Sequence, residues 1–135
     1  MAIKTKDGEP LLYEEESYLL RGLWMDLYNA IGPGHKETTY GNGFEEYLKR
    51  RDFAYEREKR LPILLDGKII GWYVADFIVF DKIIVELKSV SFIPEVFIKK
   101  LNQYLKSSEY KLGFIVNFGA AKLEIIRQIN ERCKY

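Results

Sequence analysis

Apolar residues recur at helical spacing in the first third of the chain and predict two helices. The first is expected over residues 14–31 and ends at the Gly32-Pro33-Gly34 turn. The second is expected over residues 36–51. Gly41 and Gly43 are poor helix formers, so they indicate close packing in its first turn or a delayed start.

From residue 53 the spacing changes to that of β-strands. A strand is expected over residues 53–65, and Pro62 indicates that this strand lies at an edge of the sheet or carries a bulge. Two runs rich in β-branched and aromatic residues follow, separated by a break at Asp81-Lys82, and this pattern predicts a β-hairpin. Trp72 and Tyr73 begin the first run and are expected in the core.

The C-terminal third combines a helix with a buried strand. Pro94 suits the first turn of a helix that ends near Ser107. The apolar run at 112–118 predicts a strand, parallel to a neighbour because a helix precedes it. Two patterns fit the tail, namely strand alternation at Leu123 and Ile125 and helical spacing at Ile126, Ile129 and Cys133.

The element order predicts one layered α/β domain, because three antiparallel-type strands lie between helices and a further helix and strand follow. A chain of 135 residues is long enough to bury a real core as a single domain. Residues 1–12 are polar and are expected to form a flexible N-terminal arm. The single domain is expected over residues 13–135.

Composition narrows the classes of protein. With 47% hydrophobic and 30% charged residues, the chain is typical of a soluble globular protein. No apolar run approaches the roughly 20 residues of a membrane span, and residues 1–10 lack the apolar segment of a signal peptide. The single cysteine, Cys133, excludes an internal disulfide and a cysteine-based zinc cluster, so we expect a cytoplasmic protein. The net charge of +1 leaves any nucleic-acid binding to local basic patches.

Three ionisable residues interrupt the hairpin where a strand should be apolar. Asp76 stands in the first run, and Glu86 and Lys88 stand in the second, two residues apart and so on one face. Burying a carboxylate is costly unless something compensates it, and converging carboxylates suit a hard cation such as Mg²⁺. The set is that of a metal-dependent phosphodiesterase, in which Lys88 contacts the attacking water or the developing charge. A half-exposed sheet face with a Glu86–Lys88 pair is the purely structural alternative.

The length of the hairpin loop decides whether this site can form, because paired residues of an antiparallel hairpin lie on the same face. A two-residue turn at Asp81-Lys82 would pair Asp76 with Leu87 and place Glu86 on the opposite face. The site therefore requires a three-residue loop at 80–82 or a β-bulge. We predict that Asp76 lies opposite Glu86 or Lys88.

Several ordered motifs resemble those of the GxxExxY protein family. Its signature is matched by Gly34-His35-Lys36-Glu37-Thr38-Thr39-Tyr40. The other matching motifs are Ala75-Asp76, Val85-Glu86-Leu87-Lys88, Tyr104-Leu105-Lys106, Leu112-Gly113 and Asn117-Phe118-Gly119. That family is placed in the PD-(D/E)XK nuclease-like superfamily. The resemblance implies an α/β fold with a restriction-endonuclease-like αβββαβ core, an additional N-terminal helix and a mixed sheet flanked by helices.

The resemblance also implies a catalytic set. Its members are Glu37, Asp76, Glu86 and Lys88. Asp76, Glu86 and the main-chain carbonyl of Leu87 would bind Mg²⁺, or Mn²⁺ in its place, with Glu37 as a further candidate ligand. An acidic residue in the first turn of a helix is also stabilising without any site, which is the alternative for Glu37.

Substrate contacts are assigned by the same resemblance to Lys100, Tyr104 and His35. Relatives commonly carry a glutamine four residues before this tyrosine, where this chain has Lys100. Lys100 either contacts phosphate in place of the glutamine or marks a site that has drifted. Tyr40 is expected to be a packing residue, and His35 is expected to be exposed.

Three functions are therefore compared. The leading one is a Mg²⁺-dependent nuclease that hydrolyses phosphodiester bonds in DNA or RNA. The alternative is a non-catalytic nucleic-acid-binding or protein-interaction module on the same fold, and a homodimeric scaffold without nucleic acid is the third. Nucleic acid is the expected partner, and no membrane association is expected.

Overall fold

The computed structural model describes residues 12–130. In chain order the elements are α1 (Glu14–Ile31), α2 (Glu37–Arg50), β1 (Tyr55–Leu65), β2 (Lys68–Val79), β3 (Ile83–Lys88), α3 (Glu95–Ser107), β4 (Leu112–Asn117) and β5 (Glu124–Ile129). Apart from Leu12, the arm expected at residues 1–12 lies outside the described residues, as does Cys133. None of the described helices has the length and apolar character to cross a membrane.

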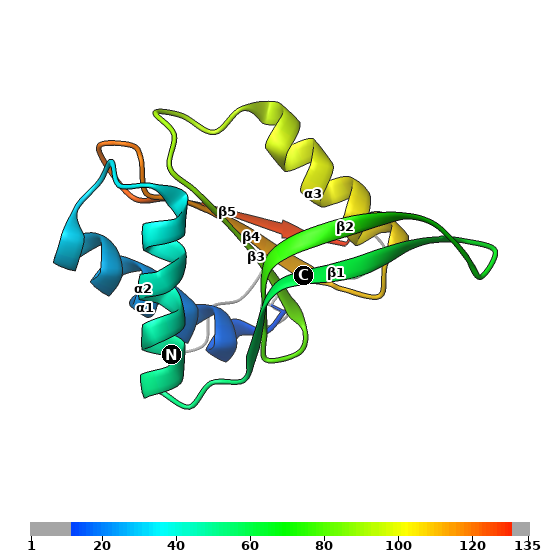
Figure 1. Cartoon of the computed structure of the whole chain (residues 1–135), viewed down its shortest axis with the longest axis horizontal. Helices are drawn as coiled ribbons and strands as arrows, with labels where there is room; N and C mark the ends of the chain where they lie inside the picture. The colour runs from blue at the N-terminus through cyan, green and yellow to red at the C-terminus, as the bar shows by residue number, and fades with distance from the viewer. Residues whose placement is uncertain (1–11, 131–135) are drawn as a thin grey trace, which may run out of the picture.

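The strands form one mixed sheet in the order β1-β2-β3-β4-β5. Only the β3–β4 pair is parallel among the described strands, as expected for strands joined through a helix. Helices α1 and α2 cover one face of the sheet and α3 covers the other (Figure 1). The layered α/β domain predicted from the element order is confirmed.

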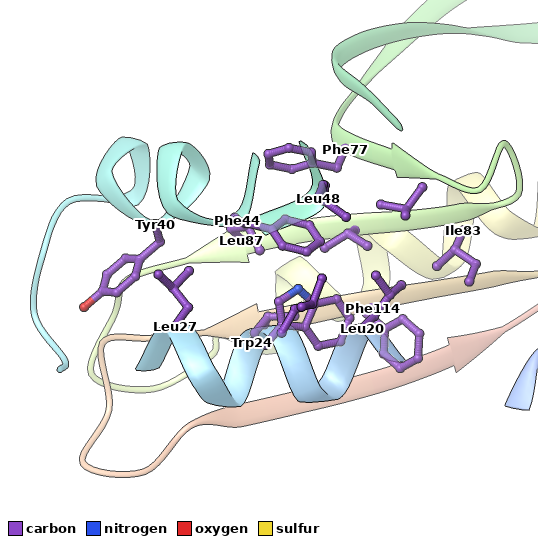
Figure 2. Packing of buried hydrophobic residues seen from close by; sticks show 14 of the residues in the cluster. Leu20, Trp24, Leu27, Tyr40, Phe44, Leu48, Phe77, Ile83, Leu87 and Phe114 are labelled. Atoms are coloured by element: carbon purple, nitrogen blue, oxygen red, sulfur yellow. The ribbon is translucent and has the colours of Figure 1, made fainter. Parts of the chain in front are cut away.

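A large apolar cluster lies between the sheet and the first two helices (Figure 2). At its centre the Trp24 ring packs against Phe44 at 5.8 Å and Phe114 at 5.2 Å between ring centroids. Tyr40 is fully buried and stacks on Phe118 at 4.3 Å, which confirms it as a packing residue. A smaller cluster under α3 includes Leu101 and Leu105 of that helix.

Strands β1 and β2 extend beyond the other strands as a long two-stranded ribbon (Figure 1). Pro62 lies in β1, the edge strand, as predicted. Tyr73 is buried, but Trp72 is 47% exposed, so the expectation that both lie in the core is wrong for Trp72. The two residues point to opposite faces of the ribbon, and the Tyr73 face is the one that joins the apolar cluster under α3.

The ambiguous tail forms strand β5, which pairs antiparallel with β4. The helical alternative for Ile126 and Ile129 is therefore wrong. All six β4 residues are buried, and a strand beside β4 satisfies its backbone donors and acceptors, whereas a helix would leave them unpaired. Tertiary pairing thus decided between two local patterns that fit equally well.

Candidate active site on the β2–β3 hairpin

The β2–β3 loop has the three-residue length that the site requires. The paired residues are Phe77 with Val85, Ile78 with Ile84 and Val79 with Ile83. The loop is therefore Phe80, Asp81 and Lys82, of which the first two are left-handed at φ 56° and 59°. Asp76 and Glu86 are the next residues of the two strands after the pair Phe77 and Val85, so they adjoin the paired part of the hairpin. The regular two-residue turn is absent from this hairpin, as predicted.

Both carboxyl groups are held by hydrogen bonds from the chain. The Leu87 backbone N–H donates to Asp76 Oδ2 at 2.8 Å, across the two strands. Glu86 is only 8% exposed, and its Oε1 accepts a hydrogen bond from the Tyr73 hydroxyl at 2.9 Å. Two acidic side chains from neighbouring strands are thus fixed side by side.

The pKa of Glu86 reflects both its burial and the closeness of Asp76. Burial raises the pKa of Glu86 to about 8, and the charge of Asp76 and a hydrogen bond to it raise it as well. The hydrogen bond from Tyr73 and the charge of Lys88 oppose the shift. At neutral pH the Glu86 carboxyl therefore holds a proton in the metal-free protein.

Asp76 lies where strand β2 changes the side of the sheet that it faces. Tyr73 and Ala75 belong to the apolar cluster under α3, whereas Phe77 and Val79 belong to the cluster under α1 and α2. The odd-numbered residues before Asp76 therefore face α3, whereas those after it face α1 and α2. At this change of side, Asp76 interacts with Glu86 on the α3 side and lines a pocket on the α2 side.

That pocket lies between α2 and the start of the ribbon and has a volume of about 210 Å³. Glu37, the first residue of α2, lines it together with Asp76. The remaining lining residues are Thr38, Gly41, Arg57, Glu58, Phe77 and Leu87. The structure thus brings Glu37 and Asp76 to one pocket, while Glu86 lies beside Tyr73 and is not part of its lining.

The lysines and Tyr104 gather on the α3 side of the sheet. The Lys88 ammonium lies 4.5 Å from the centre of the Phe97 ring, and that of Lys100 lies 5.8 Å from the Tyr73 ring. Tyr104 is buried and stacks on Tyr73 at 4.5 Å. Tyr104 therefore reaches Glu86 through Tyr73, and Lys100 is the exposed member of this group.

His35 is exposed, as expected, and lies on the loop that leads into α2. Its Nε2 is 2.8 Å from the Ile31 carbonyl oxygen, and its backbone N–H donates to the Tyr40 hydroxyl at 3.1 Å. The Ser89 hydroxyl donates to the His35 carbonyl at 2.5 Å. These bonds tie the start of α2, and with it Glu37, to the segment after β3.

Three residues near the site were not predicted. Tyr73 was expected only as a core residue, although a tyrosine hydroxyl in an apolar strand indicates a buried partner. Asn117 carries the same kind of signal, as a polar residue at the end of an apolar strand. Arg57 belongs with Lys59 and Arg60 to a basic cluster that could follow a phosphate backbone, but the glutamates interleaved with it favoured a solvated face.

The donor set fits a hard divalent cation bound by two carboxylates. Burial, and then the neighbouring charge of Asp76, raise the pKa of the Glu86 carboxyl, and a cation would replace the proton that Glu86 holds. Within residues 12–130 no group of three or more His, Cys, Asp or Glu side chains is arranged to hold a metal ion. Further ligands would therefore come from the main chain, water or substrate.

Comparison with known proteins assigns the fold. A family model described as the PD-(D/E)XK nuclease superfamily matches residues 14–128. No curated protein and no solved structure matches the chain. The order α2, β1, β2, β3, α3, β4 is that of the expected αβββαβ core, preceded by the additional helix α1 and followed by β5. With nearly its whole length matched and this arrangement of strands and helices, the chain belongs to the PD-(D/E)XK nuclease superfamily.

Proposed function

We propose that the protein is a Mg²⁺-dependent nuclease that hydrolyses phosphodiester bonds in DNA or RNA, as a cytoplasmic member of the GxxExxY family. The observation that carries the proposal is the carboxyl pair of Asp76 and Glu86, which interact with each other from adjacent strands. A carboxylate buried as Glu86 is, beside Asp76, is costly without compensation, and a divalent cation bound by both acids would provide that compensation.

A separate hydrogen bond orients each residue of the pair. Leu87 N–H orients Asp76, and the Tyr73 hydroxyl orients Glu86. Asp76, Glu86 and the Leu87 main-chain carbonyl would bind Mg²⁺, or Mn²⁺, and Glu37 would contribute from the α2 side of the pocket. A bound ion would polarise the phosphate and make its water ligand more acidic.

Lys88 is assigned to the attacking water or to the charge that develops on the phosphate. It follows Glu86 by two residues and so lies on the same face of β3. Its ammonium rests against Phe97, which limits the orientations of the side chain. Lys100 and His35, which are exposed, are proposed as substrate-binding residues. Tyr104, which the resemblance assigned to the substrate, is buried and is proposed to hold Tyr73 in position.

A cleavage assay with Lys88→Ala tests this function. Wild type should cleave at least one single-stranded, duplex or branched substrate in Mg²⁺ or Mn²⁺. Loss of a contact made only in the transition state typically costs 10²-fold or more, so Lys88→Ala should lose that much activity while still binding Mn²⁺. Lys99→Ala is the control, because Lys99 is an exposed lysine of α3 paired with Glu95. Activity of Lys88→Ala within about threefold of wild type would remove its role.

The second candidate is a binding module without catalysis. It is favoured because no three His, Cys, Asp or Glu side chains of residues 12–130 are arranged to hold one metal ion, and because Lys100 stands in place of the expected glutamine. Binding of nucleic acid without cleavage, unchanged in Glu86→Ala, would support it. A homodimer without nucleic acid would instead show no salt-dependent binding to any oligonucleotide.

A further inference from the structure

Arg57 is the positively charged residue that lines the pocket containing Asp76 and Glu37. It lies in β1 and pairs with Phe77, the residue that follows Asp76 in β2. The acidic residues that line the pocket are Glu37, Glu58 and Asp76. A phosphate that enters this pocket would therefore meet three carboxylates and one guanidinium.

The guanidinium of Arg57 is held in one orientation. Its Nη1 donates to Asn42 Oδ1 at 2.8 Å and to Glu45 Oε1 at 3.1 Å. Its central carbon lies 5.4 Å from the centre of the Phe77 ring. Glu45 is itself fixed by a hydrogen bond from the Tyr55 hydroxyl at 2.8 Å. The side chain thus has little rotamer freedom left to lose when a ligand binds.

Gly41 explains why the other end of the guanidinium can reach the pocket. A Cβ atom on Gly41 would stand 2.4 Å from Arg57 Nη2, well inside contact distance. Nη2 therefore lies against the bare backbone of α2, in a space that any other residue would fill. This accounts for the glycine in the first half of the helix, where it costs helix stability.

The two terminal nitrogens of the Arg57 guanidinium have different surroundings. Nη1 makes both of the hydrogen bonds that tie Arg57 to α2, and within residues 12–130 the N–H groups of Nη2 have no protein acceptor. Arginine binds phosphate oxygens through such a planar set of donors. A purely structural arginine would need only the contacts to Asn42 and Glu45.

We propose that Arg57 is a phosphate-binding residue, which uses Nη2 to hold a backbone phosphate of the nucleic acid beside Asp76. The inference rests on the proposed function, because it takes nucleic acid as the ligand of this pocket. In this role the positive charge of Arg57 offsets the repulsion between the nucleic acid and the three carboxylates of the pocket. Gly41 is the positioning residue that leaves room for it.

Binding of labelled DNA oligonucleotides in Ca²⁺, over a series of salt concentrations, tests the proposal. Loss of one phosphate contact lowers the slope of log affinity against log salt concentration by about one. Arg57→Gln should show that change, with binding weakened about tenfold. Mn²⁺ affinity should stay within about threefold of wild type, since a phosphate contact is not a metal ligand. Arg50→Gln is the matched control, because Arg50 is an exposed arginine of α2 that also pairs with a glutamate, Glu46.

Gly41→Ala provides a second variant that keeps every charge. Its new methyl group would displace Nη2, so it should weaken oligonucleotide binding as Arg57→Gln does. Circular dichroism and thermal melting establish that each variant is folded. If Arg57→Gln does not fold, Arg57→Lys and Gly41→Ala decide the question, because both retain the positive charge.

The outcomes separate this proposal from the nuclease itself. Unchanged affinity and salt slope in Arg57→Gln would overturn the role of Arg57 even if wild type cleaves DNA. Binding that depends on Arg57 in a wild type that never cleaves would keep the role and overturn the nuclease. A wild type that binds neither DNA nor RNA oligonucleotides would overturn both.

Discussion

At the scale of single residues, Glu86 makes the stability of the protein depend on pH. Its pKa is raised to about 8 in the folded protein, from an ordinary value of 4.5. Between these two pH values the folded state holds a proton that the unfolded state has released. Stability must therefore fall as the pH rises through this window, since it falls wherever the native state binds more protons.

We predict that the metal-free protein loses stability between pH 5 and pH 9 and that Glu86→Gln largely removes this loss. Each pKa unit corresponds to about 1.4 kcal/mol, so the expected decrease for wild type is on the order of a few kcal/mol. Urea unfolding in EDTA at several pH values measures it. Parallel stability curves for the two proteins would show that Glu86 titrates normally.

At the scale of elements, the three-residue loop between β2 and β3 controls which side chains share a face. Removing one loop residue changes the register by one and sends every side chain of β3 to the other face. Five of the six β3 residues are buried, so both faces of the strand are tightly packed. A register shift would therefore disturb both apolar clusters together.

We predict that deletion of Asp81 destabilises the protein by more than about 3 kcal/mol, the range of large core disruptions, and abolishes Mn²⁺ binding. Asp81→Asn is the control, because it keeps the loop length and tolerates the left-handed backbone at this exposed position. Thermal melting and metal titration compare the two variants. A deletion variant that melts and binds Mn²⁺ like Asp81→Asn would contradict the importance of register.

A second feature at this scale is a set of hydrogen bonds from Asn117, here called the clamp, that holds the chain after β3. Asn117 is fully buried, and its side chain bonds both the N–H and the carbonyl of Val90 at 2.9 Å. It also accepts from Gly119 N–H at 3.0 Å and donates to Glu124 at 2.7 Å. Because Val90 follows Lys88 by two residues, this clamp fixes the chain just beyond the proposed catalytic lysine.

We predict that Asn117→Ala costs about 2–4 kcal/mol of unfolding free energy, since buried backbone groups lose their partners at about 1–3 kcal/mol each. Denaturant unfolding measures the loss. The control is Asn102→Ala, at an exposed position on α3, which should change stability by less than about 0.5 kcal/mol. Equal stability of the two variants would show that water replaces the Asn117 bonds.

Much of this arrangement could be predicted from the sequence, for identifiable reasons. The periodic apolar stripe of residues 14–31 predicted α1 in full. The charges at Asp76 and Glu86 required the odd loop length, although the local pattern favoured a two-residue turn. The position of Arg57 in the pocket and the exposure of Trp72 could not be predicted, because both depend on where the ribbon leaves the sheet, which no local periodicity encodes.

At the scale of the whole molecule, a bound ion would act on the global unfolding equilibrium. Asp76 and Glu86 lie on different strands, so unfolding separates them and destroys the proposed site. A ligand that binds only the native state, present at about 100 times its dissociation constant, stabilises it by about 2.7 kcal/mol. Mg²⁺ must also displace the Glu86 proton, so its effect should be larger above pH 8 than at pH 6.

We predict that Mg²⁺ raises the melting temperature of wild type at pH 8.5 and leaves that of Asp76→Asn unchanged. In metal-free buffer at the same pH, Asp76→Asn should melt higher than wild type, because it removes the repulsion between the two carboxylates. Calorimetry with and without Mg²⁺ measures both effects. Equal shifts in the two proteins would argue against a metal site at Asp76.

The short β2–β3 loop also has a consequence for the order of folding. The hairpin closes over three residues, whereas β3 meets β4 only across the connection that contains α3. Loop-closure entropy and contact order both favour the local pairing first. Asp76 and Glu86 should therefore come together while the hairpin is still in water, with both groups charged. Docking of α3 then removes Glu86 from solvent, so we expect its proton to be taken up in the late, slow part of folding.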